Sequence, residues 1–238
     1  MGGTKKLLEM LYLPKIDKAQ ATGIKLLRVL SVEDQNKVEI IENNGVDVLI
    51  ANMTGTTKPI EMDAMWTLRN ISDQINNHTN VQTEPVLRLC IDKLSSHDIN
   101  HVISAAGILS NLTCNDYINK TKFVELGGVI QMTRVVQRAS DKDGFRDDVV
   151  EPGITTLRHV TRDRGDDQGE MGTWAENARR KCQTLIPTAI QLLGPAKASW
   201  PTVKATIGFL RNIAHDKKVH FKNTACLRDF LTTKIDAF

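Results

Sequence analysis

Pairs of polar residues recur within short apolar phrases of this sequence, and their chemistry is that of binding rather than catalysis. Each pair follows a leucine, and the four pairs are Arg69-Asn70, Ser110-Asn111, Arg158-His159 and Arg211-Asn212. An asparagine amide both donates and accepts hydrogen bonds, so it can hold the main chain of an extended peptide whatever its side chains. Arginine pairs with carboxylates, so the arginines predict attraction for acidic side chains.

The asparagines allow two interpretations. Either each amide donates a hydrogen bond to a neighbouring part of the fold, or it faces a groove in which a ligand binds. Lys120 and Lys204 lie in phase with the arginines and would add to a cationic lining of such a groove. In that case we expect the acidic residues to lie largely on loops and outer faces.

Motifs of enzymatic chemistry are missing from the sequence. It contains no Walker-type glycine loop, no G-x-S-x-G and no G-x-G-x-x-G pattern. His97 and His101 are four residues apart, a spacing that can place two metal ligands on one helix face, but no cysteine or carboxylate cluster completes a site. We expect both histidines at the surface near a helix start, and we predict a non-enzymatic protein without catalytic residues, metal or cofactor.

Composition predicts a globular, helical protein. The chain has 238 residues, of which 41% are hydrophobic, 25% charged and only 5% aromatic. An interior filled by Leu, Ile, Val, Ala and Met suits stacked helices better than a β-sandwich. No apolar stretch approaches the roughly 18 to 20 residues of a membrane-spanning helix, and the amino terminus lacks the apolar run of a signal peptide. We therefore expect a soluble, intracellular chain with no membrane insertion.

The net charge and the cysteine spacing give no sign of nucleic-acid binding or of disulfide bonds. Lys and Arg total 31 while Asp and Glu total 28, and a net charge of +3 gives no indication of direct nucleic-acid binding. The four cysteines, Cys90, Cys114, Cys182 and Cys226, are widely spaced and form no C-x-x-C pair. Isolated cysteines of this kind are expected to be reduced and mostly buried.

One five-residue phrase recurs along the chain and predicts its architecture. Its second residue lies at positions 28, 69, 110, 158 and 211, so the spacings are 41, 41, 48 and 53 residues. This period is close to the roughly 40 to 47 residues of armadillo or HEAT repeats. We predict one domain over residues 1–238, an all-α solenoid of about five repeats with partial repeats at its ends. The phrases are Leu27–Ser31, Leu68–Ser72, Leu109–Thr113, Leu157–Thr161 and Leu210–Ala214.

Each repeat is predicted to contain a short helix, a glycine turn, a second helix, a polar loop and a long third helix that carries the phrase. Asn44-Gly45 and Gly127-Gly128 lie between apolar runs, where a glycine in the left-handed conformation can turn one helix into the next. Pro59 and Pro201 suit the first turn of a third helix, because the missing N–H costs little there.

Longer segments around these phrases resemble consecutive armadillo repeats of the β-catenin family, in which plakoglobin is a close relative. The resemblance covers roughly residues 15 to 230, in the same order and spacing. It is carried by Trp66–Asp73, Ala105–Asn115, Glu151-Pro152 with Leu157–His159, and Trp200-Pro201 with Lys204–Asn212.

This resemblance implies a right-handed superhelix of three-helix repeats whose positive groove binds extended acidic segments. The partners that it implies are Tcf/Lef transcription factors, cadherin cytoplasmic tails, APC and axin, in Wnt signalling and cell adhesion. It further implies a monomer that is found in the cytoplasm, the nucleus and cell junctions.

The resemblance also assigns groove residues, position by position. Lys120 matches a lysine that pairs with a partner Asp or Glu, Arg28 replaces a lysine, and Asp163 stands where the family has a groove arginine. The residues that match groove positions are Arg28, Trp66, Arg69, Asn70, Asn111, Lys120, Arg158, His159, Trp200, Lys204, Arg211 and Asn212.

Two other functions share parts of this pattern. An importin-α-like transport receptor uses W-x-x-x-N on successive third helices, which Trp66 and Asn70 match once. A glycine stands at the tryptophan position four residues before Asn111 and Asn212, and importin cargo is basic, as this lining is. A purely junctional cadherin adaptor would use the same groove, so the sequence does not separate it from a transcriptional role.

Overall fold

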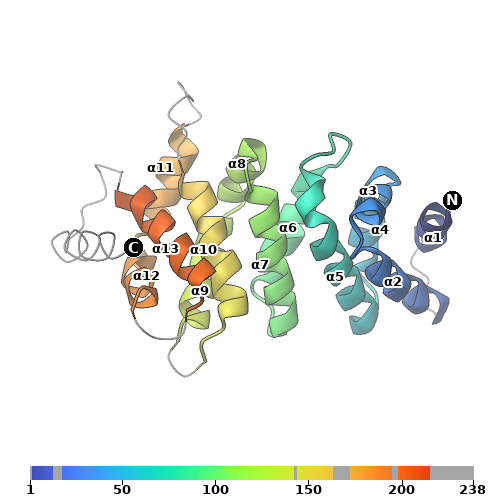
Figure 1. Cartoon of the computed structure of the whole chain (residues 1–238), viewed down its shortest axis with the longest axis horizontal. Helices are drawn as coiled ribbons and strands as arrows, with labels where there is room; N and C mark the ends of the chain where they lie inside the picture. Colours follow the sequence, from blue (N-terminus) through green and yellow to red (C-terminus); the bar gives the residue numbers. More distant parts are fainter. Residues whose placement is uncertain (1, 13–17, 142–143, 163–171, 195–197, 215–238) are drawn as a thin grey trace.

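The computed structural model describes residues 2–12, 18–141, 144–162, 172–194 and 198–214, so that Asp163 and Cys226 lie outside the described residues. Every regular element within these ranges is a helix (Figure 1). The elements are α1 (Gly3–Leu11), α2 (Lys18–Leu30), α3 (Asp34–Glu42), α4 (Gly45–Asn52), α5 (Lys58–Ile75), α6 (Thr83–Lys93), α7 (Ile99–Thr113), α8 (Tyr117–Glu125), α9 (Gly128–Ala139), α10 (Asp147–Thr161), α11 (Gly172–Lys181), the 3-10 helix η1 (Gln183–Leu185), α12 (Ile186–Leu192) and α13 (Trp200–Ala214).

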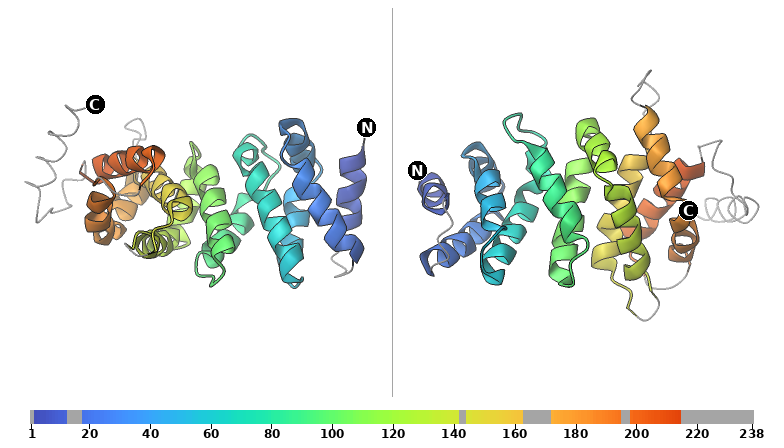
Figure 2. Two further views of the ribbon diagram at one scale, coloured as in Figure 1. Left: turned by 60° about the horizontal axis from the view of Figure 1, so that its bottom comes forward. Right: turned by 180° about the vertical axis from the view of Figure 1, so that it is seen from behind.

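The helices form an elongated stack in which repeats follow one another in sequence order. The third helices α2, α5, α7, α10 and α13 carry the five phrases, and each packs beside the next. Figure 2 shows the same order from two further sides, with α2 and α13 toward opposite ends of the described stack. The predicted all-α solenoid of armadillo repeats is therefore confirmed.

The number of helices differs between repeats. The repeats that end in α5, α10 and α13 have three α-helices each, the last of them with η1 in addition, whereas the repeat that ends in α7 has only α6 and α7, which is one helix fewer than predicted. Residues 76–80, Asn-Asn-His-Thr-Asn, replace its first helix and are poor helix formers. Instead, Asn76 Nδ2 donates to the carbonyl oxygen of Leu112 at 3.0 Å and ties the end of α5 to the end of α7.

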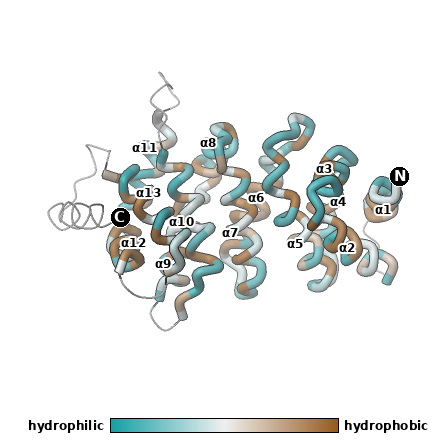
Figure 3. Tube along the Cα trace, in the orientation of Figure 1, coloured by the Kyte–Doolittle hydropathy of each residue, from teal (hydrophilic) through white to brown (hydrophobic). Residues whose placement is uncertain are grey.

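The core follows the phrases along the whole stack. The leucine that opens each phrase is fully buried in all five copies: Leu27, Leu68, Leu109, Leu157 and Leu210. Hydrophobic and hydrophilic stretches alternate along the third helices (Figure 3), as they must in helices that bury one face. Core packing of this kind needs contacts only between neighbouring repeats.

Helix α2 shows what a third helix buries against the repeat before it. Leu26, which directly precedes its phrase, is 48% exposed, and no described third helix lies before α2. The equivalent residues of the other four phrases are fully buried: Thr67, Ile108, Thr156 and Phe209. The side of each third helix that faces the preceding repeat is thus an interior surface.

The two predicted glycine turns are built differently from each other. Gly127 adopts the left-handed conformation with φ of 77°, as predicted, but in the other turn it is Asn44 that does so, with φ of 59°. Asparagine tolerates this conformation, so Gly45 is not needed for it. Gly45 and Gly128 instead begin helices that pack closely on the preceding ones, because a Cβ atom on Gly45 would lie 2.5 Å from the carbonyl oxygen of Ile40.

The two prolines that were predicted at helix starts, and most of the described cysteines, lie where they were expected. Pro59 and Pro201 lie in the first turns of α5 and α13. Cys90 and Cys182 are buried and free, and burial raises the pKa of each thiol to about 12. Cys114 is free and exposed, so two of the three described thiols are buried, in line with the expectation that they mostly are.

Across the described ranges, no helix combines the length and apolar character that crossing a bilayer requires.

Replacing Gly45 with alanine tests the close helix contact. The new Cβ would meet a backbone oxygen, which cannot move aside as a side chain can, so we expect Gly45→Ala to lower the free energy of unfolding by roughly 1 to 3 kcal/mol. The control is Gly144→Ala, because no atom lies within 4 Å of a Cβ at that position. Urea denaturation curves measure both variants, and equal midpoints would contradict the predicted contact.

Candidate binding face of the third helices

The third residue of each phrase from α5 onward bonds to the preceding repeat. Asn70 Nδ2 donates to Ser31 Oγ at 2.9 Å, and Asn111 Nδ2 donates to Ser72 Oγ at 2.8 Å. Asn212 Nδ2 lies 3.3 Å from Thr161 Oγ1. The acceptor is in each case the fifth residue of the preceding phrase, and we call this series of contacts the inter-repeat ladder.

His159 takes the place of asparagine in the ladder. Its Nδ1 lies 3.3 Å from Thr113 Oγ1, the fifth residue of the preceding phrase, and the ring also bonds to the backbone of Ser110. Burial lowers the pKa of the ring from 6.5 to about 4, and the nearby charges of Lys120 and Arg158 act in the same direction. The ring is therefore neutral at pH 7.

The inter-repeat ladder uses only part of the hydrogen-bonding capacity of Asn70 and Asn111. One amide N–H of Asn70 and of Asn111 bonds to the neighbouring repeat, while the amide oxygens have no hydrogen-bond partner among the described residues. An asparagine amide has two donors and one acceptor oxygen. The fold-building interpretation of the asparagines is thus observed, and it does not compete with ligand binding because the oxygen and one N–H remain.

Two phrase arginines lie across glycines of the following repeat. A Cβ atom on Gly107 would lie 2.8 Å from Nε of Arg69, and one on Gly208 would lie 2.5 Å from Nε of Arg158. The Arg69 guanidinium also lies over the Trp66 ring, 5.1 Å from its centroid, a cation–π contact. These glycines occupy the position at which the importin pattern has tryptophan, and each makes room for a guanidinium.

Arg28 differs from the other phrase arginines because a carboxylate already pairs with it. Its Nη1 lies 3.2 Å from Oδ1 of Asp63 on the next third helix, α5. The expectation that acidic residues lie on loops and outer faces is therefore wrong for Asp63. Arg28 is less available to an acidic ligand than its place in the phrase implies.

The remaining predicted residues form two groups. Lys120 on α8 is 6% exposed, and its charge lowers the pKa of His159, which places it in the neighbourhood of that ring. Lys204 and Arg211 are exposed on α13, the helix that also carries Asn212. Trp200, 56% exposed, begins the same helix.

Sequence reasoning missed two sets of residues that build this face. The fifth phrase residues Ser31, Ser72, Thr113 and Thr161 are the acceptors of the ladder, and their recurrent hydroxyl groups were the available signal. The other set is Gly107 and Gly208, on which the arginines pack. From the sequence they were interpreted only as positions that lack the tryptophan of the importin pattern. The contact that they make spans two repeats and leaves no local pattern.

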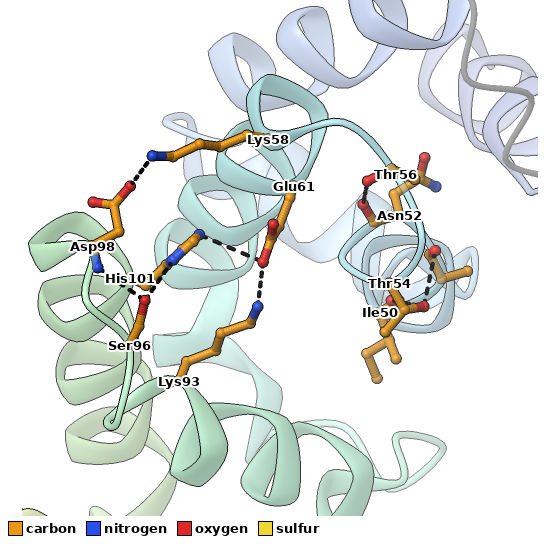
Figure 4. A network of polar contacts seen from close by, with 11 residues as sticks. Ile50, Asn52, Thr54, Thr56, Lys58, Glu61, Lys93, Ser96, Asp98 and His101 are labelled. Carbon is orange, nitrogen blue, oxygen red and sulfur yellow. Dashed lines mark hydrogen bonds and ion pairs between the residues drawn. The ribbon is translucent and has the colours of Figure 1, made fainter.

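A second polar cluster joins the ends of α5, α6 and α7 (Figure 4). Glu61 pairs with Lys93 and lies 3.5 Å from His101 Nε2, while Ser96 Oγ lies 3.0 Å from His101 Nδ1. His101 is 6% exposed, so its expected place at the surface is wrong: α7 begins at Ile99, which turns this side chain inward, whereas His97 stays exposed. Within the described ranges no three His, Cys, Asp or Glu side chains group so as to hold a metal ion.

Stacked helical repeats with polar pairs in their third helices define an armadillo-repeat protein. Junction plakoglobin of Xenopus laevis is 36% identical over 213 residues, which are 90% of this chain and 27% of that protein. Catenin beta of Urechis caupo is 35% identical over 213 residues, 90% of this chain and 24% of that protein. The chain belongs to the β-catenin and plakoglobin family. It spans about a quarter of the length of these relatives.

Solved structures agree with the fold. A chain from the study of a phosphorylation switch that controls the interaction between cadherin and β-catenin matches with a TM-score of 0.75 and 26% identity, over 89% of this chain and 37% of that one. The designed armadillo repeat protein YIII(Dq)4CqI matches with a TM-score of 0.68 and 12% identity, over 90% of this chain and 84% of that one. No protein-family model matches the sequence.

The pKa of His159 makes a testable contribution to stability. Between about pH 6.5 and pH 4 the unfolded chain binds a proton at this ring that the folded chain does not bind, so stability falls as the pH falls through this window. Relative to His159→Asn, which keeps a donor in the ladder, the wild type should lose roughly 2 to 3 kcal/mol more over this window. Urea denaturation at several pH values measures the difference. A ring that titrates near pH 6.5 in an NMR experiment would contradict it.

Proposed function

We propose that this chain is a non-enzymatic scaffold that binds extended acidic peptides along the face of its third helices. The observation that carries the proposal is the row of three amides and one imidazole on the third helices α5, α7, α10 and α13, with an arginine directly before them on α5, α10 and α13. Arg69, which directly precedes Asn70, packs on Gly107, and Arg158, which directly precedes His159, packs on Gly208. Lys120 lies near His159. A peptide main chain can bond to the amides while its carboxylates meet the cations.

The relatives suggest which peptides these are. Plakoglobin is described as a junction protein, and the structural match comes from work on cadherin and β-catenin. We therefore propose a cadherin cytoplasmic tail as the first partner, with the cytoplasm and cell junctions as the location. Acidic segments of Tcf/Lef factors, APC and axin share the required chemistry, and a Tcf/Lef partner would add a nuclear role in Wnt signalling.

Charge argues against the importin-like alternative. A basic cargo peptide would meet Arg158, Lys204 and Arg211, and like charges in contact weaken association. At the glycine positions the guanidiniums of Arg69 and Arg158 fill the space that a tryptophan would need. The purely junctional adaptor uses the same face, so it differs from the present proposal only in its set of partners.

Charge reversal on α13 tests the proposal without disturbing the core. Lys204 and Arg211 are exposed, and neither forms an ion pair within the described part of the chain, so the double variant Lys204→Glu, Arg211→Glu should fold normally. We expect it to weaken binding of a fluorescein-labelled acidic cadherin-tail peptide by about tenfold, or ~1.4 kcal/mol. Fluorescence anisotropy measures the dissociation constant, which should also rise with salt.

The controls for this experiment use the same chain. Arg134→Glu reverses an exposed charge on α9, a second helix, and should leave the affinity unchanged. A labelled peptide of alternating Lys and Arg should bind no variant tightly. Unchanged affinity of the α13 double variant for the acidic peptide, or preference for the basic one, would show that this face does not bind acidic segments.

The glycine beneath Arg158 gives a second test, which leaves the net charge unchanged. A methyl group on Gly208 would collide with Nε of Arg158, whose flexible side chain can move away, so Gly208→Ala should change the free energy of unfolding by less than ~1 kcal/mol. Because the guanidinium is displaced, we expect the acidic peptide to bind about threefold to tenfold more weakly. In an Arg158→Gln background the same change should have no further effect on affinity, and an equal loss there would exclude this mechanism.

A further inference from the structure

A buried hydroxyl closes each of the first four phrases and contacts both a carbonyl oxygen of its own helix and the next repeat, and the chemistry of these partners fixes the direction of the bonds. Ser31 Oγ donates to the carbonyl oxygen of Arg28 at 2.7 Å, and Ser72 Oγ donates to that of Arg69 at 2.8 Å. A carbonyl oxygen can only accept, and a hydroxyl has only one hydrogen to give. In the ladder contact with the next repeat, the hydroxyl oxygen must therefore accept.

This constraint decides how each asparagine amide is turned. Because the hydroxyl of Ser31 accepts, Asn70 must present its NH2 group rather than its oxygen, and the same holds for Asn111 opposite Ser72. Asn212 confirms the direction independently, since its Nδ2 also lies 2.9 Å from the carbonyl oxygen of Arg158, which cannot donate. The amide oxygens are thereby turned away from the neighbouring repeat.

The same reasoning fixes the tautomer of His159. Thr113 Oγ1 donates to the carbonyl oxygen of Leu109 at 2.8 Å, so the His159 ring must donate to Thr113 through Nδ1. The ring is neutral at pH 7, because its pKa is lowered to about 4. A neutral ring with its proton on Nδ1 has a lone pair on Nε2, so His159 offers an acceptor just as an asparagine does.

We propose that Ser31, Ser72, Thr113 and Thr161 are positioning residues of the peptide-binding face, which turn one hydrogen-bond acceptor per repeat toward the ligand. They do not touch the ligand themselves, because all four are at most 1% exposed. The ligand class follows from the acceptors: an extended peptide whose main-chain N–H groups are free at the positions that face Asn70, Asn111, His159 and Asn212. This inference rests on the proposed function and specifies which backbone groups the ligand must supply.

Thr161 and Thr156 provide a matched pair of variants on one helix. Both are buried in α10, and each hydroxyl donates to the carbonyl oxygen four residues earlier, at 2.7 and 2.8 Å. Only Thr161 also accepts from the next repeat, through Asn212. Thr161 Oγ1 also lies 3.3 Å from the carbonyl oxygen of Arg158, a longer contact that Thr156 lacks. Thr161→Val and Thr156→Val therefore remove the same short bond within the helix, and they differ chiefly in the ladder contact.

The test combines these variants with a set of acidic cadherin-tail peptides, each N-methylated at one backbone nitrogen. For the unmodified peptide we expect Thr161→Val to raise the dissociation constant about fivefold relative to Thr156→Val. For the wild type, one N-methylated peptide should bind markedly more weakly than the rest because it lacks the N–H that faces Asn212. Thr161→Val should add no further loss for that peptide, a result that general destabilisation would not give.

The possible failures are distinguishable. If the wild type binds the unmodified peptide and the α13 charge reversal weakens it, but the two valine variants bind equally, the proposed function stands and the positioning role is wrong. An equal loss by Thr161→Val for every N-methylated peptide would likewise overturn the positioning role. If the wild type binds no acidic peptide, the proposed function and this inference both fail. Urea denaturation of each variant confirms that a folded chain is being compared.

Discussion

Side-by-side packing of the third helices is the contact on which the rest of this structure depends. Each described third helix after α2 packs against the third helix before it, so the residue before its phrase is fully buried, whereas Leu26 on α2 is not. A polar group at such a contact must find a partner on the adjacent helix, because an unpaired buried group is costly. The phrases meet this requirement with an amide or imidazole at the third position from α5 onward, which bonds to a hydroxyl at the fifth position of the preceding phrase.

The same polar groups can serve the fold and a ligand because each has more bonding capacity than the fold uses. Asn70 and Asn111 give one N–H to the preceding repeat and keep an oxygen. The arginines divide their roles similarly: aliphatic and Nε atoms of Arg69 and Arg158 pack on glycines, while the charge remains at the end of the side chain. In the proposed binding face, side chains that the fold already holds in place have less freedom to lose when a ligand binds, which reduces the ordering cost of binding.

The sequence alone predicted the parts of the structure that local pattern determines. Five recurrent phrases located the five third helices, and Pro59 marked the start of one of them. Predictions failed where the conformation or burial of a residue depends on contacts with residues elsewhere in the fold. Asn44, not Gly45, adopts the left-handed conformation while Gly45 packs closely on Ile40, and His101 lies inward beside Glu61. The arginine–glycine contacts were also out of reach, because their two residues lie in different repeats.

Those arginine–glycine contacts make the repeats less interchangeable than their common helical plan suggests. The arginine of each contact is in one repeat and the glycine that accommodates it is in the next, so moving a single repeat to a new position would separate the two. A larger residue in place of Gly107 or Gly208 would be tolerated best if the preceding arginine changed at the same time. During divergence these positions should therefore co-vary across the repeat boundary, and an engineer who shuffles repeats should move the two repeats that share such a contact together.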